Sequence, residues 1–294
     1  MSIDQQSKID KVRGQGLDKF YTDPSYSKKC IQKVLDLYPN WDLMVEPSAG
    51  NGSFFAQLPT GYHKIGMDIS PEHPDIQTQD FFEYSPASTL ITEMNPRILV
   101  IGNPPFGRVS SLAIKFFNHA AEWANVIAFI VPRTFRKISV QNKLHRNFKL
   151  VYDEEVPTKP CCFSPPMMVK CCFQIWEKTV DNREIIDLPT RHIDWEFMAF
   201  GPLDQKGQPT PPLGADFAIR AYGGKIGEIK TEGLLELRPK SWHWIKSTIV
   251  DKKELIRRFL LLDYSDSQNT ARQNSMGKGE LVSIYSSNVF NAKL

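Results

Sequence analysis

The chain has 294 residues, of which 41% are hydrophobic and 23% are charged, a composition typical of an ordinary globular protein with a sizeable core. No run approaches the ~20 apolar residues of a membrane span, and the polar N-terminus lacks the apolar centre of a secretion signal. These features favour an intracellular protein, cytoplasmic or, for a eukaryotic or viral source, nuclear or viral. The net charge of +3 is too small to indicate a nucleic-acid partner, because charge must be clustered to attract a polyanion.

The first two thirds of the chain alternate between helical and apolar patterns. A helix is predicted over 25–38, where apolar positions recur on one face, and a second amphipathic helix over 111–124. Almost wholly apolar strands are predicted at 42–45, 63–68, 98–101 and 125–132, and two further strands at 148–156 and 169–178, joined by a Pro-rich loop. Apolar strands that alternate with helices are typical of a parallel sheet covered on both faces. We therefore expect a doubly wound, Rossmann-like α/β fold.

The composition changes after the last of these strands. From about residue 187 the chain is rich in Gly, Pro and polar residues, so we predict a sheet domain over 1–180 and a smaller accessory region over 181–294. A glycine-kinked strand pair is expected over 217–230. Basic and aromatic residues interleave in this region, which favours contact with nucleic acid, although buried tryptophans fit equally well: Arg220, Tyr222, Lys225, Lys230, Arg238, Lys240, Trp242 and Trp244.

The cysteines favour strand interiors over a metal site. The chain has five, Cys30, Cys161, Cys162, Cys171 and Cys172, and an odd number without a secretion signal indicates reduced thiols. Zinc sites usually space two thiolates as C-x-x-C, whereas adjacent cysteines in an extended segment point to opposite faces. We expect buried strand cysteines and no metal.

A glycine-rich turn follows the first strand, with the sequence EPSAGNG over 46–52. Glycine permits positive φ and close approach of a ligand to the backbone. The turn lacks both the phosphate-binding P-loop pattern and a full G-x-G-x-x-G, which favours an adenosine ligand smaller than a dinucleotide. The next strand ends in Asp68, where an acid accepts hydrogen bonds from ribose hydroxyls. Farther on, Asp80 offers a carboxylate to an adenine amino group and Phe81 a ring to stack on the base.

The sequence Asn103-Pro104-Pro105-Phe106 follows the strand at 98–101 and is the sharpest feature of the chain. Two prolines fix the loop and remove two backbone donors, while their carbonyls remain as acceptors. Adenine N6 is a poor nucleophile because its lone pair is delocalised into the ring. Accepting both N6 hydrogens at Asn103 and the Pro104 carbonyl would localise that lone pair and stabilise the developing positive charge, and Phe106 could stack on the base.

These motifs resemble the class I methyltransferases that carry [DNS]-P-P-[YFW] and act on amino groups. EPSAGNGSF resembles their cofactor loop, GMDIS their ribose-binding strand end and NPPF their catalytic motif, while DKFYTDP over 18–24 resembles the motif that packs on the methionine end of the cofactor. The resemblance implies S-adenosyl-L-methionine as cofactor, bound by Phe20, Tyr21, Thr22, Glu46, Pro47, Ala49, Gly50, Gly52, Asp68, Ile69, Asp80 and Phe81.

The motif order is similar to the gamma order of N6-adenine DNA methyltransferases, including those of restriction-modification systems. Similar NPPF motifs occur in RNA adenine methyltransferases, and NPPY motifs also methylate glutamine side chains in proteins, so RNA and protein substrates are alternatives to DNA. A catalytically silent domain that binds nucleic acid or pairs with an active partner is the alternative from another class.

A duplex substrate requires base flipping, and the flipped base needs a second wall opposite Phe106. The resemblance makes Phe163, in the loop between the last two strands, the candidate for that wall. Phosphate contacts need basic residues at the carboxyl edge of the sheet, and the candidates are Arg108, Arg133, Arg136 and Lys137. We expect a nucleic-acid partner, DNA rather than RNA, no membrane, and either a homodimer or a partner subunit.

Overall fold

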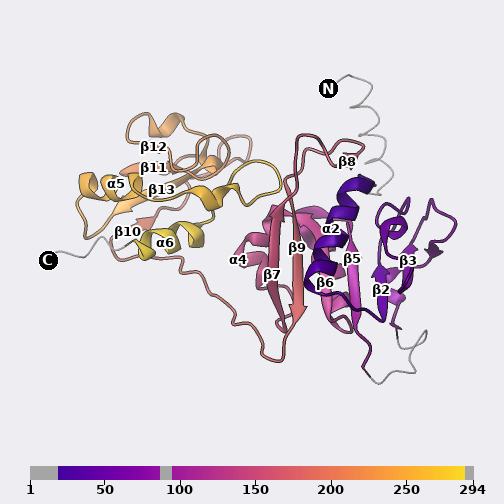
Figure 1. The fold of residues 1–294 in the computed structure, drawn as a ribbon. Helices are drawn as coiled ribbons and strands as arrows, with labels where there is room; N and C mark the ends of the chain where they lie inside the picture. The colour runs from indigo at the N-terminus through magenta and orange to yellow at the C-terminus, as the bar shows by residue number, and fades with distance from the viewer. Residues whose placement is uncertain (1–18, 87–94, 289–294) are drawn as a thin grey trace. The chain divides into compact units, whose positions relative to one another are not determined.

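The computed structural model describes residues 19–86 and 95–288, and the chain divides into two compact units, 1–185 and 186–294 (Figure 1). Each unit has its own sheet and its own hydrophobic core. Within the described ranges, no helix combines the length and the apolar character that a bilayer crossing requires.

The first unit contains a seven-stranded sheet in the order β4-β3-β2-β5-β6-β9-β7. Its strands are β2 (Leu43–Glu46), β3 (His63–Asp68), β4 (Gln77–Thr78), β5 (Ile98–Gly102), β6 (Val126–Pro132), β7 (Phe148–Glu155) and β9 (Cys171–Lys178). The strands from β4 to β6 are parallel, whereas β9 is antiparallel to both of its neighbours. The chain runs outward from β2 to β4 and then returns to β5, so the order reverses between β2 and β5, which is where doubly wound sheets bind ligands. The predicted fold class is confirmed.

Helices cover both faces of this sheet. α2 (Pro24–Leu37) packs on one face with Met44 and Ile101, and α3 (Ser111–Ala121) packs on the other with Val45 and Val100. Successive strand residues therefore enter different cores, which explains why the strands have no polar alternation. Shorter helical segments are η1 (Phe55–Gln57), η2 (Phe81–Glu83), η4 (Arg108–Ser110), η5 (Arg133–Arg136) and α4 (Ile138–Gln141).

The cysteines of β9 follow the same alternation. Cys171 lies in the core under α2 and Cys172 in the core under α3, so adjacent cysteines point to opposite faces as expected. Cys30 and Cys162 are also buried, and Cys161 is exposed.

The start of α2 is fixed locally. Asp23 Oδ1 accepts a hydrogen bond of 2.9 Å from the Ser25 N–H, and Pro24 occupies the first turn, where its missing donor is harmless. Just before this cap, β1 (Tyr21–Thr22) pairs antiparallel with β8 (Phe163–Ser164). This two-stranded ribbon joins the segment before α2 to the loop between β7 and β9, a pairing between distant segments that sequence periodicity does not indicate.

The second unit contains a four-stranded antiparallel sheet in the order β10-β13-β11-β12. Its strands are β10 (Trp195–Phe197), β11 (Phe217–Arg220), β12 (Ile229–Lys230) and β13 (Trp242–Ser247), its helices α5 (Lys252–Leu260) and α6 (Lys278–Ser287), and its short turns η6 (Leu234–Glu236), η7 (Pro239–Ser241) and η8 (Ser265–Gln268). β11 and β12 form the expected strand pair. Both α-helices pack on one face of the sheet with Phe217 and Ile245.

The aromatic residues of the second unit are mostly structural. Trp242 and Trp244 are buried on the sheet face opposite the helices, so the idea that they stack on nucleic acid is wrong and the alternative of buried tryptophans is confirmed. The Arg220 guanidinium lies 4.3 Å from the centre of the Trp242 ring, and its Nε donates to Glu228 at 2.7 Å. Tyr222 remains half exposed.

Candidate functional site

The predicted motifs meet at the carboxyl edge of the first unit's sheet. The glycine-rich turn leaves the end of β2, Asp68 ends β3, and the Asn-Pro-Pro-Phe loop leaves the end of β5. β2 pairs directly with both β3 and β5. Parallel strands present their carboxyl ends at one edge, so the three motifs are neighbours at the point where the strand order reverses.

The glycine-rich turn depends on both of its glycines. Gly50 has φ of +50° and Gly52 of +83°, a region that side chains rarely adopt. A Cβ atom at Gly50 would also lie 2.8 Å from Tyr21 Cε1, so the Tyr21 ring packs directly on the turn. The Gly50 N–H donates to Asp68 Oδ2 at 3.0 Å. The turn, the strand-end acid and the N-terminal motif are therefore held together.

Asp68 is oriented by the backbone and keeps acceptor capacity. Its Oδ1 accepts from the Ser70 N–H at 2.8 Å, and its Oδ2 accepts from Gly50. A carboxylate oxygen can accept more than one hydrogen bond, so both oxygens can still receive a hydroxyl donor. Ile69, the next residue, is 59% exposed and offers apolar surface beside the carboxylate. This combination suits a nucleoside, which has polar ribose hydroxyls and a flat base.

Glu46 and Thr22 carry buried polar atoms that lack partners. Glu46 is 2% exposed, and neither its Oε2 nor the Thr22 Oγ1 has a hydrogen-bond partner among the described residues. Burial raises the pKa of the Glu46 carboxyl well above its usual value, and the negative charge of Asp68 raises it further, against a backbone hydrogen bond from Phe55 that lowers it. Buried polar groups are normally satisfied. Two unsatisfied ones within the predicted cofactor set fit a polar ligand at this place.

The raised pKa of Glu46 predicts a pH dependence of stability. In the unfolded chain this carboxyl loses its proton near 4.5, whereas the folded chain retains it to higher pH. The free energy of unfolding therefore falls as pH rises above 4.5 and through the folded pKa. Glu46→Gln removes this component, so its stability relative to the parent should increase from mildly acidic to neutral pH. Urea unfolding across that range checks it, and parallel stability curves for the two proteins would contradict it.

An ion pair closes the N-terminal segment onto the turn. Glu72 Oε1 accepts from the Tyr21 hydroxyl at 2.6 Å and pairs with Lys19 Nζ at 2.8 Å, while the Glu72 N–H donates to the Gly50 carbonyl at 2.8 Å. Hydrogen bonds from Lys19 and then Tyr21 lower the pKa of Glu72, and burial followed by the bond to Glu72 raises that of Tyr21. Sequence reasoning missed Lys19 and Glu72, because both lie in polar segments without periodicity.

The Asn103 side chain has a fixed orientation. Its Nδ2 donates to the Phe20 carbonyl at 3.0 Å. Because a carbonyl oxygen only accepts, the amide nitrogen must face Phe20, and the amide oxygen is left for another donor. Among the described residues nothing donates to Asn103 Oδ1. The N-terminal motif therefore orients the asparagine so that it presents an acceptor.

The backbone carbonyls of the same loop differ in their bonding. The Asn103 carbonyl accepts from Ser48 Oγ at 3.3 Å, and the Phe106 carbonyl accepts from the N–H groups of Leu112 and Ala113. Within the described part of the chain, no backbone N–H is bonded to the Pro104 carbonyl. Asn103 Oδ1 and the Pro104 carbonyl are thus two acceptors that the fold leaves open in neighbouring residues.

The segment after these acceptors is strained. Phe106 is partly buried and contacts both cores of the sheet, which anchors it at the sheet's end. Val109 and Ser110 have φ of 53° and 61°, a left-handed conformation that costs roughly 1–3 kcal/mol per non-glycine residue. Ser110 Oγ lies 2.7 Å from Thr134 Oγ1 at the end of β6, a hydrogen bond that holds this conformation. Such strain is typical of functional loops.

The structure changes the interpretation of Asp80 and Phe81. Phe81 is 1% exposed and stacks on Phe116 in the core, with ring centroids 5.1 Å apart, so it does not offer a face to adenine. Asp80 Oδ1 accepts from the Phe82 N–H at 2.9 Å and caps η2. The exposed ring of this segment belongs to Phe82. Because Phe81 and Phe82 are adjacent in the sequence, the sequence does not indicate which of the two rings faces the core.

Phe163 also has a different place from the one expected. It is 7% exposed, pairs with Thr22 across the ribbon and packs in the core under α2. A ring buried to this extent is not an open wall for a flipped base, so its predicted stacking role is replaced by a structural one.

Phe163→Ala should therefore destabilise the protein by about 3 kcal/mol, because it removes a buried ring and leaves a cavity. Phe82→Ala is the matched control, since Phe82 is exposed and should cost below about 1 kcal/mol. Denaturant unfolding measures both. Equal stability of the two variants, with a raised Michaelis constant for Phe163→Ala alone, would restore the stacking role.

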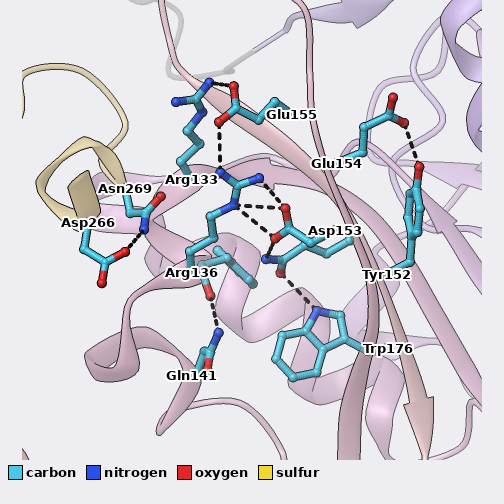
Figure 2. Close-up of polar contacts among 12 residues, drawn as sticks. Arg133, Arg136, Gln141, Tyr152, Asp153, Glu154, Glu155, Trp176, Asp266 and Asn269 are labelled. Atoms are coloured by element: carbon cyan, nitrogen blue, oxygen red, sulfur yellow. Dashed lines mark hydrogen bonds and ion pairs between the residues drawn. The ribbon is translucent and has the colours of Figure 1, made fainter. Parts of the chain in front are cut away.

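The four residues predicted to contact phosphate differ in their surroundings. Arg136 binds Asp153 and Arg133 binds Glu155, so neither guanidinium lies open to solvent as a surface charge (Figure 2). Arg108 is exposed beside the Asn-Pro-Pro-Phe loop, and Lys137 is half-buried. For Arg136, which is fully engaged, the predicted substrate contact is replaced by a structural role.

No protein-family model matches the chain, and no curated protein matches it in sequence. Similar solved structures include a candidate RNA methyltransferase from Pyrococcus horikoshii (15% identity over 56% of this chain and 89% of that one, TM-score 0.41). A second is the 23S rRNA methyltransferase ErmE (14% identity over 56% of this chain and 71% of that one, TM-score 0.40). A third is a modification subunit of a candidate type I restriction enzyme from Vibrio vulnificus (12% identity over 92% of this chain and 62% of that one, TM-score 0.41). At these identities and TM-scores the likeness carries no conclusion about chemistry, and the function rests on the residues of the site.

Proposed function

We propose that the chain is an S-adenosyl-L-methionine-dependent methyltransferase that modifies the exocyclic amine of adenine in DNA. The observation that carries the proposal is the orientation of Asn103, whose amide nitrogen is bound to the Phe20 carbonyl while its oxygen stays open. An amine donor bound at this loop would meet two acceptors, the Asn103 Oδ1 and the Pro104 carbonyl.

These two acceptors match the chemistry of a planar amine. Adenine N6 carries two hydrogens, and accepting both draws its lone pair out of conjugation and toward an electrophile. The same acceptors stabilise the positive charge that develops on nitrogen during transfer. Because the prolines and Ser48 fix the loop before substrate arrives, little reorganisation is needed. The partly buried Phe106 ring packs at the sheet's end, where it would stack on the base.

Without Phe81, the other residues proposed to bind the cofactor still form one consistent site. Asp68 would hold the ribose hydroxyls, Ile69 would contact the base, and Gly50 leaves room for close approach. Tyr21, Thr22 and Glu46 would surround the polar methionine end, where two unsatisfied polar atoms lie. S-adenosyl-L-methionine would supply the electrophilic methyl group. The chain's own contribution is to place acceptors on the target amine and to fix the donor beside it.

DNA is favoured over RNA or protein by the resemblance to the gamma motif order and by the extra unit over 186–294, which we propose recognises the target sequence. A base in a duplex must leave the stack to reach Asn103. The exposed Arg108 beside the loop would provide charge for phosphate contacts.

The test is transfer of a labelled methyl group. The purified chain is incubated with tritiated-methyl cofactor and, separately, with unmethylated duplex DNA, single-stranded RNA and a peptide pool. The proposal expects label in DNA above the other two pools. Label in RNA or in peptide glutamine alone would keep the catalytic loop and overturn the substrate, and cofactor binding without label in any pool would favour a catalytically silent partner.

A further inference from the structure

Two arginines follow β6 and meet two acids at the end of β7, in a cluster that Figure 2 shows in detail. Arg136 is engaged on all sides. Its Nε donates to both carboxylate oxygens of Asp153, at 2.9 and 3.1 Å, and its Nη1 donates to Glu155 Oε1 at 3.1 Å. Asp153 also accepts from Gln174 Nε2 at 2.6 Å. Arg136 is therefore a fixed part of the fold.

Arg133 differs from Arg136 in its partners. Its Nη2 is bound to Glu155 Oε2, while its Nε is buried without an acceptor among the described residues. The Arg133 side chain is only 13% exposed, whereas that of Glu155 is 55% exposed. A mostly buried arginine side chain is thus paired with a largely exposed carboxylate, which also accepts from Arg136. Lys170 is a neighbour of Arg133, because the Arg133 N–H donates to the Lys170 carbonyl at 2.9 Å. Burial first, and then the positive charge of Arg133, lower the pKa of Lys170.

This cluster borders the catalytic loop. Arg133 is the first residue after β6, and the next residue, Thr134, is hydrogen-bonded to Ser110 at the end of the Asn-Pro-Pro-Phe segment. β5 and β6 are parallel neighbours, so both segments leave the same edge of the sheet. A nucleic acid whose base reaches Asn103 must run its backbone past this edge.

We propose that Arg133 is a phosphate-binding residue for the substrate backbone and that Glu155 occupies the phosphate position until substrate arrives. The inference rests on the proposed function and names a contact of the same site. Carboxylate and phosphate present similar oxygen pairs to a guanidinium. Because the Glu155 side chain is 55% exposed, a phosphate can reach the position that its carboxylate occupies. Arg136 keeps its hydrogen bonds to Asp153 throughout.

Glu155 then limits nucleic-acid affinity, because it competes with phosphate and adds negative charge beside it. Its neighbour Glu154 supplies a matched control. Figure 2 shows Glu154 on the other side of β7, where it binds the Tyr152 hydroxyl at 3.0 Å and Lys29 at 2.6 Å. Glu154→Gln makes the same charge change one residue away and on the opposite face, so it separates a local effect from a change in net charge.

The experiment measures binding of the full chain to fluorescent duplex and single-stranded oligonucleotides over a series of salt concentrations. Glu155→Gln should bind about 3- to 10-fold more tightly than Glu154→Gln, and Arg133→Ala about 10-fold more weakly than the parent, with a salt slope smaller by about 1. When Glu155→Gln is added to the Arg133→Ala variant, it should increase the affinity for the oligonucleotide much less than it does in the parent chain. If Arg133→Ala fails to fold, Arg133→Lys takes its place in the experiment. This variant retains the positive charge but loses the paired N–H donors of the guanidinium, so it should bind the oligonucleotide with intermediate affinity.

The inference is overturned if Glu155→Gln and Glu154→Gln bind alike, or if the gain from Glu155→Gln is unchanged without Arg133. Failure of the proposed function is distinguishable from either. If the chain binds oligonucleotides in this pattern but transfers no methyl group, the phosphate contact stands and the catalytic assignment is wrong. If the chain methylates DNA but the Glu155→Gln and Glu154→Gln variants bind it with equal affinity, the catalytic assignment stands and the phosphate contact is wrong.

Discussion

Asn103→Ala is expected to lower the turnover number for methyl transfer by about 10²–10³-fold, the usual cost of removing one preorganised hydrogen-bonding group from a transition state. The variant loses the Oδ1 acceptor and the bond between Nδ2 and the Phe20 carbonyl. The cofactor residues at the ends of β2 and β3 are untouched. Single-turnover kinetics at saturating substrate measure the chemical step directly.

Cofactor affinity is the internal control for this variant. Calorimetry should give a dissociation constant within about threefold of the parent, because no interaction proposed for the cofactor involves the Asn103 side chain. Near-normal turnover would contradict the acceptor role. Loss of turnover together with a large loss of cofactor affinity would indicate instead that Asn103 acts by holding the segment at Phe20 in place.

Asp68→Ala should weaken cofactor binding by about 10- to 100-fold, since hydrogen bonds to a charged group contribute roughly 1.5–3 kcal/mol. The variant loses the acceptors for the ribose and also the bond from the Gly50 N–H, which ties the glycine turn to β3. Turnover at saturating cofactor should change much less, because Asp68 is not placed on the target amine.

Calorimetry with S-adenosyl-L-methionine checks this, and Asp75→Ala is the matched control. Asp75 lies in the loop after β3 and its side chain is 76% exposed, so the same substitution there removes a charge without a predicted ligand contact. Asp68→Asn should bind with intermediate affinity, because it keeps one acceptor oxygen. Equal affinities for Asp68→Ala and Asp75→Ala would remove the ribose role.

The sheet of the first unit was predictable because its strands are buried on both faces. The run at 98–101 and the run at 125–132 correspond to β5 and β6, which have no exposed residue. The helix expected over 25–38 is α2, whose cap at Asp23 and proline in the first turn are local signals. The α-helices of the second unit were missed, since loop-forming residues around them dominated the pattern.

The site was predictable where its residues adjoin strand ends, as at Gly50, Asp68 and Asn103. What could not be predicted is which distant groups complete it. The Phe20 carbonyl lies far from Asn103 in sequence, and Glu72 joins Tyr21 through a side-chain contact. Periodicity reports which face of an element is buried, but not which side chains meet across two loops.

The roles predicted for Phe81, Phe163 and Arg136 failed for the same reason. Phe81 and Phe163 stand beside functional motifs, yet each ring turns into a core. Arg136 stands at the carboxyl edge as expected, but the strand order places Asp153 of β7 within reach through the intervening β9. The sequence places Arg136 at this edge but does not specify the strand pairing that brings Asp153 to it, so it could not show that this guanidinium is already engaged.

The most direct test of the acceptor mechanism is nucleoside mass spectrometry of unmethylated duplex DNA after incubation with the purified chain and S-adenosyl-L-methionine, with Asn103→Ala in parallel. We predict N6-methyladenine in the DNA treated with the parent chain and close to none with the variant. Methylation of another base, or N6-methyladenine formed equally well by Asn103→Ala, would contradict the role assigned to the loop at the end of β5.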